Sequence, residues 1–341
     1  MKHTSEGQAP IFVVGVPRSG TTLVQQMLDH HPAFAFPWES HFMAAFHRNI
    51  RRFGDLSQPS NRLALMEAIL DYVRIAQSEK LGAEWIPGLR AALPELAGKS
   101  PPNYPGIVRE MYGFLAANRA CPRWGEKTPQ YVGCMTDLLE MFPDAKFIHV
   151  VRDPRAVAAS VLPLSFRPNT AWQAATNWVR LVNSALEFER ANPGRVLRFR
   201  YEDLVTDSEK YCQLMCEFVN EPFDPGMLVY HKDASQRIVG GGHFDLVSSP
   251  PTKARIDRWK SRLRASQVRV IEAIAGETMA QFGYELTLTS ARIRLHDRVL
   301  SALGETALLF RPGTKPANFR AHAKQFVQQT RFQLKYGFWS Y

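Results

Sequence analysis

The chain has 341 residues, of which 45% are hydrophobic and 22% are charged. This composition is typical of a globular protein that buries a substantial core, and it excludes disordered, collagen-like and disulfide-stapled chains. Lys and Arg number 42 against 32 Asp and Glu, and the net charge of +10 indicates an anionic partner such as a phosphorylated ligand, a nucleic acid or a membrane surface.

The N-terminal segment has no pattern of a signal peptide. Its first apolar run, Ile11–Val16, is too short for a signal-peptide core, and no apolar stretch of the sequence reaches the roughly 18 residues that span a bilayer. The four cysteines have no CxxC spacing, so we expect buried thiols and no metal site. These features favour a cytoplasmic location.

Strands and helices alternate along the chain. Apolar or alternating runs predict strands over Ile11–Val16, Lys146–Val151 and Arg195–Tyr201. Helical patterns predict helices over Thr21–His31, several segments between residues 60 and 120, a run ending at Ser160, then Trp172–Arg190 and Glu202–Val219. This order predicts an α/β fold with a P-loop-type, doubly wound parallel sheet flanked by helices.

A phosphate-binding loop is the strongest local signal. Gly15 and Gly20 have the GxxxxG spacing of a P-loop and lie between a predicted buried strand and a predicted helix. Backbone N–H groups of such a loop, together with the start of the following helix, form a cradle for an anion.

The loop departs from the pattern of nucleotide triphosphatases. Thr21 stands where those enzymes have the Lys that reaches the β- and γ-phosphates, and the cation of this loop is Arg18. Asp153 follows the strand that ends at Val151 and resembles a metal-holding carboxylate, but its place before Pro154 favours a turn cap. The loop therefore suits a phosphorylated donor other than ATP.

Five motifs occur in order between residues 11 and 286. They are GVPRSGTTL at Gly15–Leu23, GEKTP at Gly125–Pro129, FIHVVRDPRAVAAS at Phe147–Ser160, RYEDL at Arg200–Leu204 and QFGY at Gln281–Tyr284. With these motifs the chain resembles the sulfotransferases that use 3′-phosphoadenosine 5′-phosphosulfate (PAPS), especially the bacterial branch related to protein-tyrosine sulfotransferases.

The resemblance implies a site for the donor. The loop residues that would hold the 5′-phosphosulfate are Arg18, Ser19, Gly20, Thr21 and Thr22. Arg152 and Ser160 would bind the 3′-phosphate, which suits the bidentate guanidinium and the hydroxyl donor. Tyr201 would lie near the nucleotide. The alternatives are a surface Arg152 paired with Asp153 and a core tyrosine at position 201.

The resemblance also implies how charge on the leaving oxygen is neutralised. In-line transfer of the monoanionic sulfuryl group needs side-chain cations, and no metal is expected. Arg18 and Lys127 are the candidates, because the GEKTP pattern would place Lys127 over the transferred group. Without that pattern, a solvated loop lysine is the default interpretation.

A hydroxyl acceptor needs a general base. In the resembled family this base is a Glu in a stretch that follows His-Pro, and Glu39 has the corresponding place after His31-Pro32. Pro37 and Trp38 flank Glu39, so we expect burial to raise its pKa toward a useful value. His41 is the rival base.

One part of the donor site departs from the family pattern. Ser249 lies about ten positions before Trp259, where related enzymes have a Ser, but Lys253 is too close to Trp259 for the accompanying cation. The alternatives are that Arg255 supplies that cation, that Lys253 does so, or that neither does. The glycine run at 240–242 is either a mobile lid over the nucleotide or a flexible loop.

The resemblance divides the chain into two parts. Residues 1–286 form the sulfotransferase domain, with a helical insertion at about 50–120, and residues 287–341 form a basic, helical C-terminal extension. The extension has nine basic residues against two acidic ones, a net charge of +7. Phe319, Ala323 and Phe326 have helical spacing, and the chain ends in an aromatic cluster. Peripheral membrane contact, packing on the core and contact with a second subunit are the alternatives, and no nucleic acid is expected.

The sequence therefore predicts a PAPS-dependent sulfotransferase that acts on a hydroxyl of a small-molecule, lipid or carbohydrate acceptor. Protein tyrosine is less favoured, because the chain has no secretory anchor. A P-loop kinase that uses ATP and a non-catalytic nucleotide-binding relative are the alternatives.

Overall fold

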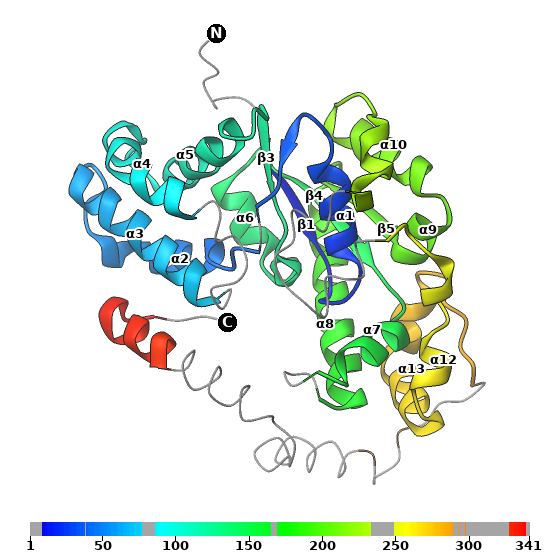
Figure 1. Ribbon diagram of the computed structural model, residues 1–341. Coiled ribbons are helices and arrows are strands. Elements are labelled where there is room, and N and C mark those ends of the chain that lie inside the picture. The colour runs from blue at the N-terminus through cyan, green and yellow to red at the C-terminus, as the bar shows by residue number, and fades with distance from the viewer. Residues whose placement is uncertain are drawn as a thin grey trace.

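The structure is a computed structural model that describes residues 9–37, 39–76, 86–164, 169–232, 249–288, 293, 297 and 327–338 (Figure 1). At its centre is a five-stranded sheet in the order β2-β3-β1-β4-β5, and every pair of neighbouring strands is parallel. The strands are β1 (Ile11–Val14), β2 (Phe34–Ala35), β3 (Arg123–Glu126), β4 (Lys146–Val151) and β5 (Val196–Arg200).

Helices cover both faces of this sheet. They are α1 (Thr21–Asp29), α6 (Met135–Met141), α7 (Pro154–Val161), α8 (Ala171–Ala191), α9 (Tyr201–Thr206), α10 (Ser208–Val219), α12 (Trp259–Arg262) and α13 (Ala265–Ala280). Short 3-10 turns lie at η1 (Ile50–Phe53), η2 (Pro129–Gly133), η3 (Pro225–Leu228), η4 (Tyr230–Lys232) and η5 (Lys253–Arg255). The predicted α/β fold with a parallel sheet flanked by helices is confirmed.

The central strand β1 is buried on both faces, as its continuous apolar sequence predicts. Phe12 joins one hydrophobic cluster and stacks on Phe147 of β4 with ring centroids 5.5 Å apart, while Ile11 and Val13 join the cluster on the opposite face. Parallel strands end at a common edge, so the loops after β1, β3 and β4 meet there.

The predicted elements differ from the structure at three points. The first strand ends at Val14, and the predicted helix Glu202–Val219 is two helices, α9 and α10, because Asp207 interrupts the first and caps the second through the N–H of Lys210. Strands β2 and β3 were not predicted. Both are short, and β3 has the sequence Arg-Trp-Gly-Glu, which lacks an apolar run.

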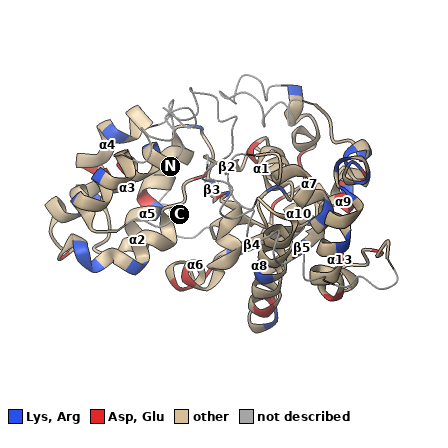
Figure 2. Cartoon of the chain, turned by 90° about the horizontal axis from the view of Figure 1, so that it is seen from below, with Lys and Arg blue, Asp and Glu red and all other residues tan. Residues whose placement is uncertain are grey.

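A separate helical block lies beside the β2 edge of the sheet. It consists of α2 (Met43–Asn49), α3 (Pro59–Ala76), α4 (Ile86–Lys99) and α5 (Tyr104–Ala117). The view from below shows this block on one side of the strands and α7, α9 and α13 on the other (Figure 2). Within the described residues, no helix is long and apolar enough to cross a membrane.

Part of the predicted C-terminal extension is helical. Residues 327–336 form a helix that returns to the helical block, where Phe332 packs 5.5 Å from Tyr72 of α3 and Phe338 packs 5.0 Å from Phe46 of α2, measured between ring centroids. Phe332 and Phe338 are both buried. Residues 289–292, 294–296, 298–326 and 339–341, including Phe319, Ala323 and Phe326, lie outside the described residues.

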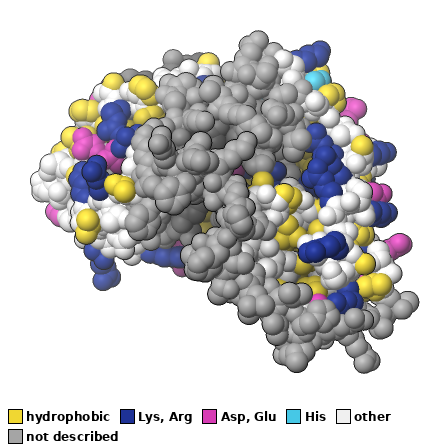
Figure 3. All heavy atoms as spheres, turned by 60° about the horizontal axis from the view of Figure 1, so that its bottom comes forward, with side chains coloured by type: hydrophobic (Ala, Val, Ile, Leu, Met, Phe, Trp, Pro, Cys, Tyr) yellow, Lys and Arg dark blue, Asp and Glu magenta, His cyan; other side chains and the backbone are white. Residues whose placement is uncertain are grey.

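Exposed basic side chains lie over the helical block and, in a larger group, on the opposite side of the molecule in the space-filling view (Figure 3). The exposed cations of the described segment 253–264 are Lys253, Arg258, Lys260, Arg262 and Arg264. Part of the positive charge of the chain therefore lies on the surface of segment 253–264.

Candidate functional site

The predicted phosphate loop lies where β1 ends and α1 begins. The Ser19 N–H donates a hydrogen bond to the carbonyl of Val16 (3.0 Å), and Gly20 forms the N-cap of α1 with φ 97°. Ser19 is completely buried, and its hydroxyl has no hydrogen-bond partner within the described part of the chain. A buried hydroxyl without a partner at the N-terminus of a helix suits an incoming anion.

Gly20 has no room for a side chain. A Cβ at this position would lie 2.3 Å from Cδ2 of Tyr201, and the positive φ would strain any other residue. The ring of Tyr201 is thus packed directly against the loop. Tyr201 was predicted to lie near the nucleotide, and that role stays a prediction. The residue is buried, as the alternative of a core tyrosine stated.

Two guanidinium groups converge on the loop. Arg18 adopts φ 78° and donates from Nε to the Ser160 hydroxyl (3.0 Å), while Arg152 donates to the carbonyl of Arg18 (3.1 Å) and lies over the Tyr201 ring, 4.2 Å from its centroid. Burial lowers the pKa of Arg18, and repulsion from Arg152 lowers it further, while Glu39 opposes this shift. Two partly buried like charges beside one loop repel each other, and bound anionic groups would relieve that repulsion.

Arg152 is not paired with Asp153. Its Nη2 donates to the carbonyl of Arg255 (3.3 Å), and its buried Nε has no partner among the described residues. Asp153 instead caps α7 by accepting from the N–H of Arg155 (2.8 Å) and forms an ion pair with the Arg155 guanidinium (2.7 Å). Asp153 is therefore the turn cap that its position before Pro154 predicted.

The second cluster of the site joins Lys127, Glu39 and His41. Lys127 is fully buried after β3, its ammonium forms an ion pair with Glu39, and it also donates to the Thr22 hydroxyl of the phosphate loop (3.3 Å). The other carboxylate oxygen of Glu39 lies 3.2 Å from Nε2 of His41. Lys127 is thus a buried residue and not a solvated loop lysine.

The expected direction of the Glu39 pKa was wrong. Burial favours the neutral carboxyl, but contact with the Lys127 ammonium and the His41 ring favours the carboxylate more strongly, and together they lower the pKa of Glu39 to about 2. The sequence placed Pro37 and Trp38 beside Glu39, but the cation that reverses the shift comes from a strand 88 residues away. In this state Glu39 is ionised throughout the neutral range.

A buried carboxylate that the sequence analysis did not single out holds the turn of the candidate base. One oxygen of Glu126 accepts hydrogen bonds from the backbone N–H of Ser40 (3.0 Å), the Ser40 hydroxyl (2.8 Å) and the Thr128 hydroxyl (2.6 Å). Ser40 lies between Glu39 and His41, and His41 has φ 58° in the left-handed region. Glu126 therefore fixes a strained turn that carries both candidate bases. Its position inside the GEKTP motif was the available signal.

Ser249 is hydrogen-bonded to Tyr230 through its backbone and not through its side chain. It is exposed, and its backbone carbonyl accepts a hydrogen bond from the Tyr230 hydroxyl (3.1 Å). In the described ranges no hydrogen bond joins its side chain to the loop or to Arg152. The backbone carbonyl of Arg255 accepts a hydrogen bond from Arg152, and residues 240–242 lie outside the described part of the chain.

The site thus has two cationic features beside one buried ion pair. The loop with Arg18, whose Nε donates to the Ser160 hydroxyl, forms the first, Arg152 on the Tyr201 ring forms the second, and Lys127 with Glu39 lies next to the loop at Thr22. Among the described residues, no group of three His, Cys, Asp or Glu side chains could hold a metal ion. The arrangement can bind a molecule with two separate anionic groups and deprotonate a neighbouring hydroxyl.

Known proteins have sequences similar to this one. A family model described as the sulfotransferase family matches residues 10–225. Protein-tyrosine sulfotransferase 1 of Danio rerio is 26% identical over 288 residues, which cover 81% of this chain and 72% of the relative, and protein-tyrosine sulfotransferase A of Caenorhabditis elegans is 26% identical over 81% of this chain and 67% of the relative.

Two solved structures have a similar fold. The sulfotransferase domain from the Synechococcus PCC 7002 olefin synthase has a TM-score of 0.55 at 26% identity and covers 82% of this chain and 98% of its own. The sulfotransferase domain from the curacin biosynthetic pathway has a TM-score of 0.54 at 22% identity, with coverage of 82% and 99%. With its matched family model and this phosphate loop, the chain belongs to the sulfotransferase family.

Proposed function

We propose that the protein transfers a sulfuryl group from PAPS to a hydroxyl of a small-molecule, lipid or carbohydrate acceptor. The observation that carries this proposal is the second cation site: Arg152 lies over Tyr201 beside the phosphate loop, with its Nε buried and unpartnered among the described residues. A nucleotide with phosphate groups on both its 3′ and 5′ positions matches two anion sites, and a loop without a Lys at position 21 does not favour ATP.

Different residues bind the two anionic ends of the donor. Ser19, Gly20, Thr21 and Thr22 offer backbone and hydroxyl donors to the 5′ group, with Arg18 as their cation. Arg152 and Ser160 bind the 3′-phosphate, and Tyr201 fixes the Arg152 guanidinium by packing against it. Ser249 is not assigned a role, because its hydrogen bond to Tyr230 uses its backbone carbonyl and not its side chain.

PAPS supplies an activated sulfuryl group whose S–O bond to the 5′-phosphate breaks as a new S–O bond to the acceptor oxygen forms. Lys127 and Arg18 neutralise the negative charge that develops on the leaving oxygen. Glu39 accepts the proton of the acceptor hydroxyl. No metal is needed for this distribution of charge.

The ion pair between Lys127 and Glu39 couples donor binding to the base. While Lys127 contacts Glu39, the low pKa makes the carboxylate a weak base. When the Lys127 ammonium turns toward an anionic donor at Thr22, Glu39 loses its nearest cation and its pKa rises. We propose that Glu39 becomes an effective base only with donor bound, and that His41 orients its carboxylate.

Acceptor transfer from labelled PAPS tests the proposal. A panel of sterols, simple sugars, phenols, hydroxy fatty acids and a tyrosine peptide is incubated with the wild-type protein and with Glu39→Gln, which keeps the shape of the side chain. We expect labelled product with at least one non-peptide hydroxyl and none with the variant. Donor binding without transfer to any member of the panel would indicate a non-catalytic relative, and transfer to the tyrosine peptide alone would overturn the proposed acceptor class.

A further inference from the structure

Apart from Tyr201, two motifs of the sequence have no role in the site as described so far. RYEDL at Arg200–Leu204 begins at the last residue of β5, and QFGY at Gln281–Tyr284 follows α13, about 80 residues later. The structure brings them into contact. The Arg200 guanidinium donates to the carbonyl of Phe282 (3.1 Å), and the Tyr284 hydroxyl donates to Oε2 of Glu202 (2.8 Å).

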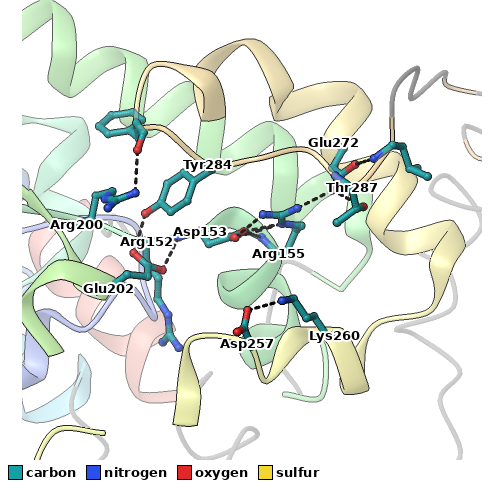
Figure 4. Close-up of polar contacts among 12 residues, drawn as sticks. Arg152, Asp153, Arg155, Arg200, Glu202, Asp257, Lys260, Glu272, Tyr284 and Thr287 are labelled. Carbon is teal, nitrogen blue, oxygen red and sulfur yellow. Dashed lines mark hydrogen bonds and ion pairs between the residues drawn. The ribbon is translucent and has the colours of Figure 1, made fainter. Parts of the chain in front are cut away.

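Glu202 connects this contact to the strand end that carries Arg152. Its other oxygen, Oε1, accepts from the backbone N–H of Asp153 (3.1 Å), the residue directly after Arg152 (Figure 4). The indole N–H of Trp178 donates to the carbonyl of Arg152 itself (2.9 Å). The single peptide unit between Arg152 and Asp153 is therefore held at both its carbonyl and its N–H.

The side chain of Glu202 is buried and fixed in orientation by its hydrogen bonds. The residue is 9% exposed, and the neighbouring residue, Tyr201, carries the ring on which the Arg152 guanidinium lies. Tyr284 is 8% exposed. A buried carboxylate whose two oxygens each accept a hydrogen bond is held in one orientation, and it transmits that orientation to the groups that donate to it.

A second buried pair supports the same strand end from the other side. The Arg155 guanidinium bridges Asp153 (2.7 Å) and Glu272 of α13 (2.7 Å), and it lies over the Trp259 ring. Glu272 in turn accepts from the Thr287 hydroxyl (2.8 Å). Figure 4 shows these contacts extending from Arg152 to α13. The segment after α13 thereby anchors the end of β4 at two points.

We propose that Tyr284 and Glu202 are positioning residues that set the orientation of Arg152, and so determine the preference of the site for a nucleotide with a 3′-phosphate. This inference rests on the proposed use of PAPS. Bidentate recognition by a guanidinium depends on its angle to the phosphate, so a small rotation of the 152–153 peptide weakens the contact to the 3′-phosphate and leaves the 5′ contacts of the loop unchanged.

Paired affinities for two nucleotides test this inference. The affinities of 3′-phosphoadenosine 5′-phosphate (PAP) and adenosine 5′-phosphate, which lacks the 3′-phosphate, are measured by calorimetry with displacement. In Tyr284→Phe the ring remains and only the hydroxyl is lost. We expect its preference for PAP to fall about threefold to tenfold while the affinity for adenosine 5′-phosphate changes less than about twofold.

Further variants separate orientation from folding. Tyr104→Phe is the matched control, because it removes another buried tyrosine hydrogen bond (3.0 Å, to the carbonyl of Met43) in the helical block. We expect it to keep the full preference. Glu202→Ala should lose the preference as Tyr284→Phe does, and Glu202→Gln, which can still accept from the Asp153 N–H, should retain most of it. Adding Arg152→Ala to the Tyr284→Phe variant should reduce the preference for PAP by a smaller factor than Arg152→Ala does in the wild-type protein.

Failure of the inference and failure of the proposed function give different results. If the wild-type protein does not prefer PAP, the proposed donor is wrong. If the wild type prefers PAP and Tyr284→Phe and Glu202→Ala keep that preference, the positioning role is wrong. Equal weakening of both nucleotides in either variant would also overturn it, because the contacts would then serve the fold alone.

Discussion

Two regions of this protein meet at residues 39–41, and different interactions stabilise the interior of each region. On the donor side, buried charges fix the ends of β4 and α7, with Arg155 bridging Asp153 and Glu272. In the helical block and the C-terminal helix, aromatic rings pack against each other, among them Phe46, Phe53, Tyr72, Phe332, Tyr336 and Phe338.

The difference has a consequence for how each region specifies its geometry. A buried ion pair or hydrogen bond requires a particular atom at a particular place, and its loss leaves a partner uncompensated. Ring packing requires mainly volume and tolerates exchange of one apolar residue for another. We therefore expect donor-side substitutions to change binding and chemistry, and substitutions in the helical block to change stability.

The residues where the regions meet give the largest expected effect. Glu39→Gln should lower kcat about 10²- to 10⁴-fold by removing the base, while PAP affinity stays within about threefold. His41→Asn should cost less, because His41 contacts Glu39 and does not replace it. Single-turnover rates with labelled PAPS measure both. A larger loss in His41→Asn than in Glu39→Gln would make His41 the base.

The aromatic region should respond in stability alone. Phe332→Ala removes a buried ring that contacts Phe46 and Tyr72, and it should lower the free energy of unfolding by about 3 kcal/mol. PAP affinity of the folded protein should stay within about twofold. Leu334→Ala on the same helix is the control, because Leu334 is 81% exposed and its loss should change stability by less than about 0.5 kcal/mol. A loss of nucleotide binding in Phe332→Ala would erase the contrast between the regions.

The phosphate loop offers a test of close packing on the donor side. Gly20→Ala places a Cβ against the Tyr201 ring and should weaken PAP binding at least about tenfold, by displacing the ring that supports Arg152. Gly194→Ala is the matched control: Gly194 also has a positive φ, 78°, but a Cβ there meets no atom within 4 Å. Equal PAP affinities in the two variants would show that close packing of Gly20 against Tyr201 does not control PAP binding.

The smallest expected effect concerns a buried histidine in the middle of β4. Burial, and then the Arg198 charge, lower the pKa of His149 to about 3, and neither ring nitrogen has a partner among the described residues. The unfolded chain therefore binds a proton between about pH 6.5 and pH 3 that the folded chain does not, and stability contributed by neutral His149 falls as the pH drops below 6.5.

His149→Leu removes this dependence. Relative to the wild type, its free energy of unfolding should rise by about 2 kcal/mol between pH 7.5 and pH 5, as measured by urea denaturation at both values. The same relative stability at both pH values would show that His149 is solvated or hydrogen-bonded in the folded protein.

Local sequence patterns predicted those strands whose burial follows from their own apolar residues. Strand β4 has the predicted bounds, Lys146–Val151, and its last five residues are buried, four of them apolar and one the histidine at position 149. Strand β3 could not be predicted in this way, since Arg123 and Glu126 are buried only by virtue of partners elsewhere in the chain, such as Glu221 and Ser40. Tertiary contacts override a weak local pattern there.

The candidate site shows the same division. The phosphate loop was evident from glycine spacing, and the predicted residues from Arg18 to Tyr201 lie together around it. The sequence did not reveal that Lys127 would pair with Glu39, and so the expected pKa shift had the wrong direction. The roles of Glu126, Glu202 and Tyr284 were likewise hidden, because each depends on a hydrogen bond to a distant segment.

The donor assignment is tested most directly by titrating the wild-type protein with PAP and, separately, with ATP and Mg²⁺ in a calorimeter. Because Arg152 provides a second anion site and position 21 is a threonine, we expect PAP to bind with a dissociation constant on the order of micromolar and ATP–Mg²⁺ to bind at least about 100-fold more weakly. Binding of ATP–Mg²⁺ equal to or tighter than that of PAP would contradict the assignment and favour a P-loop kinase.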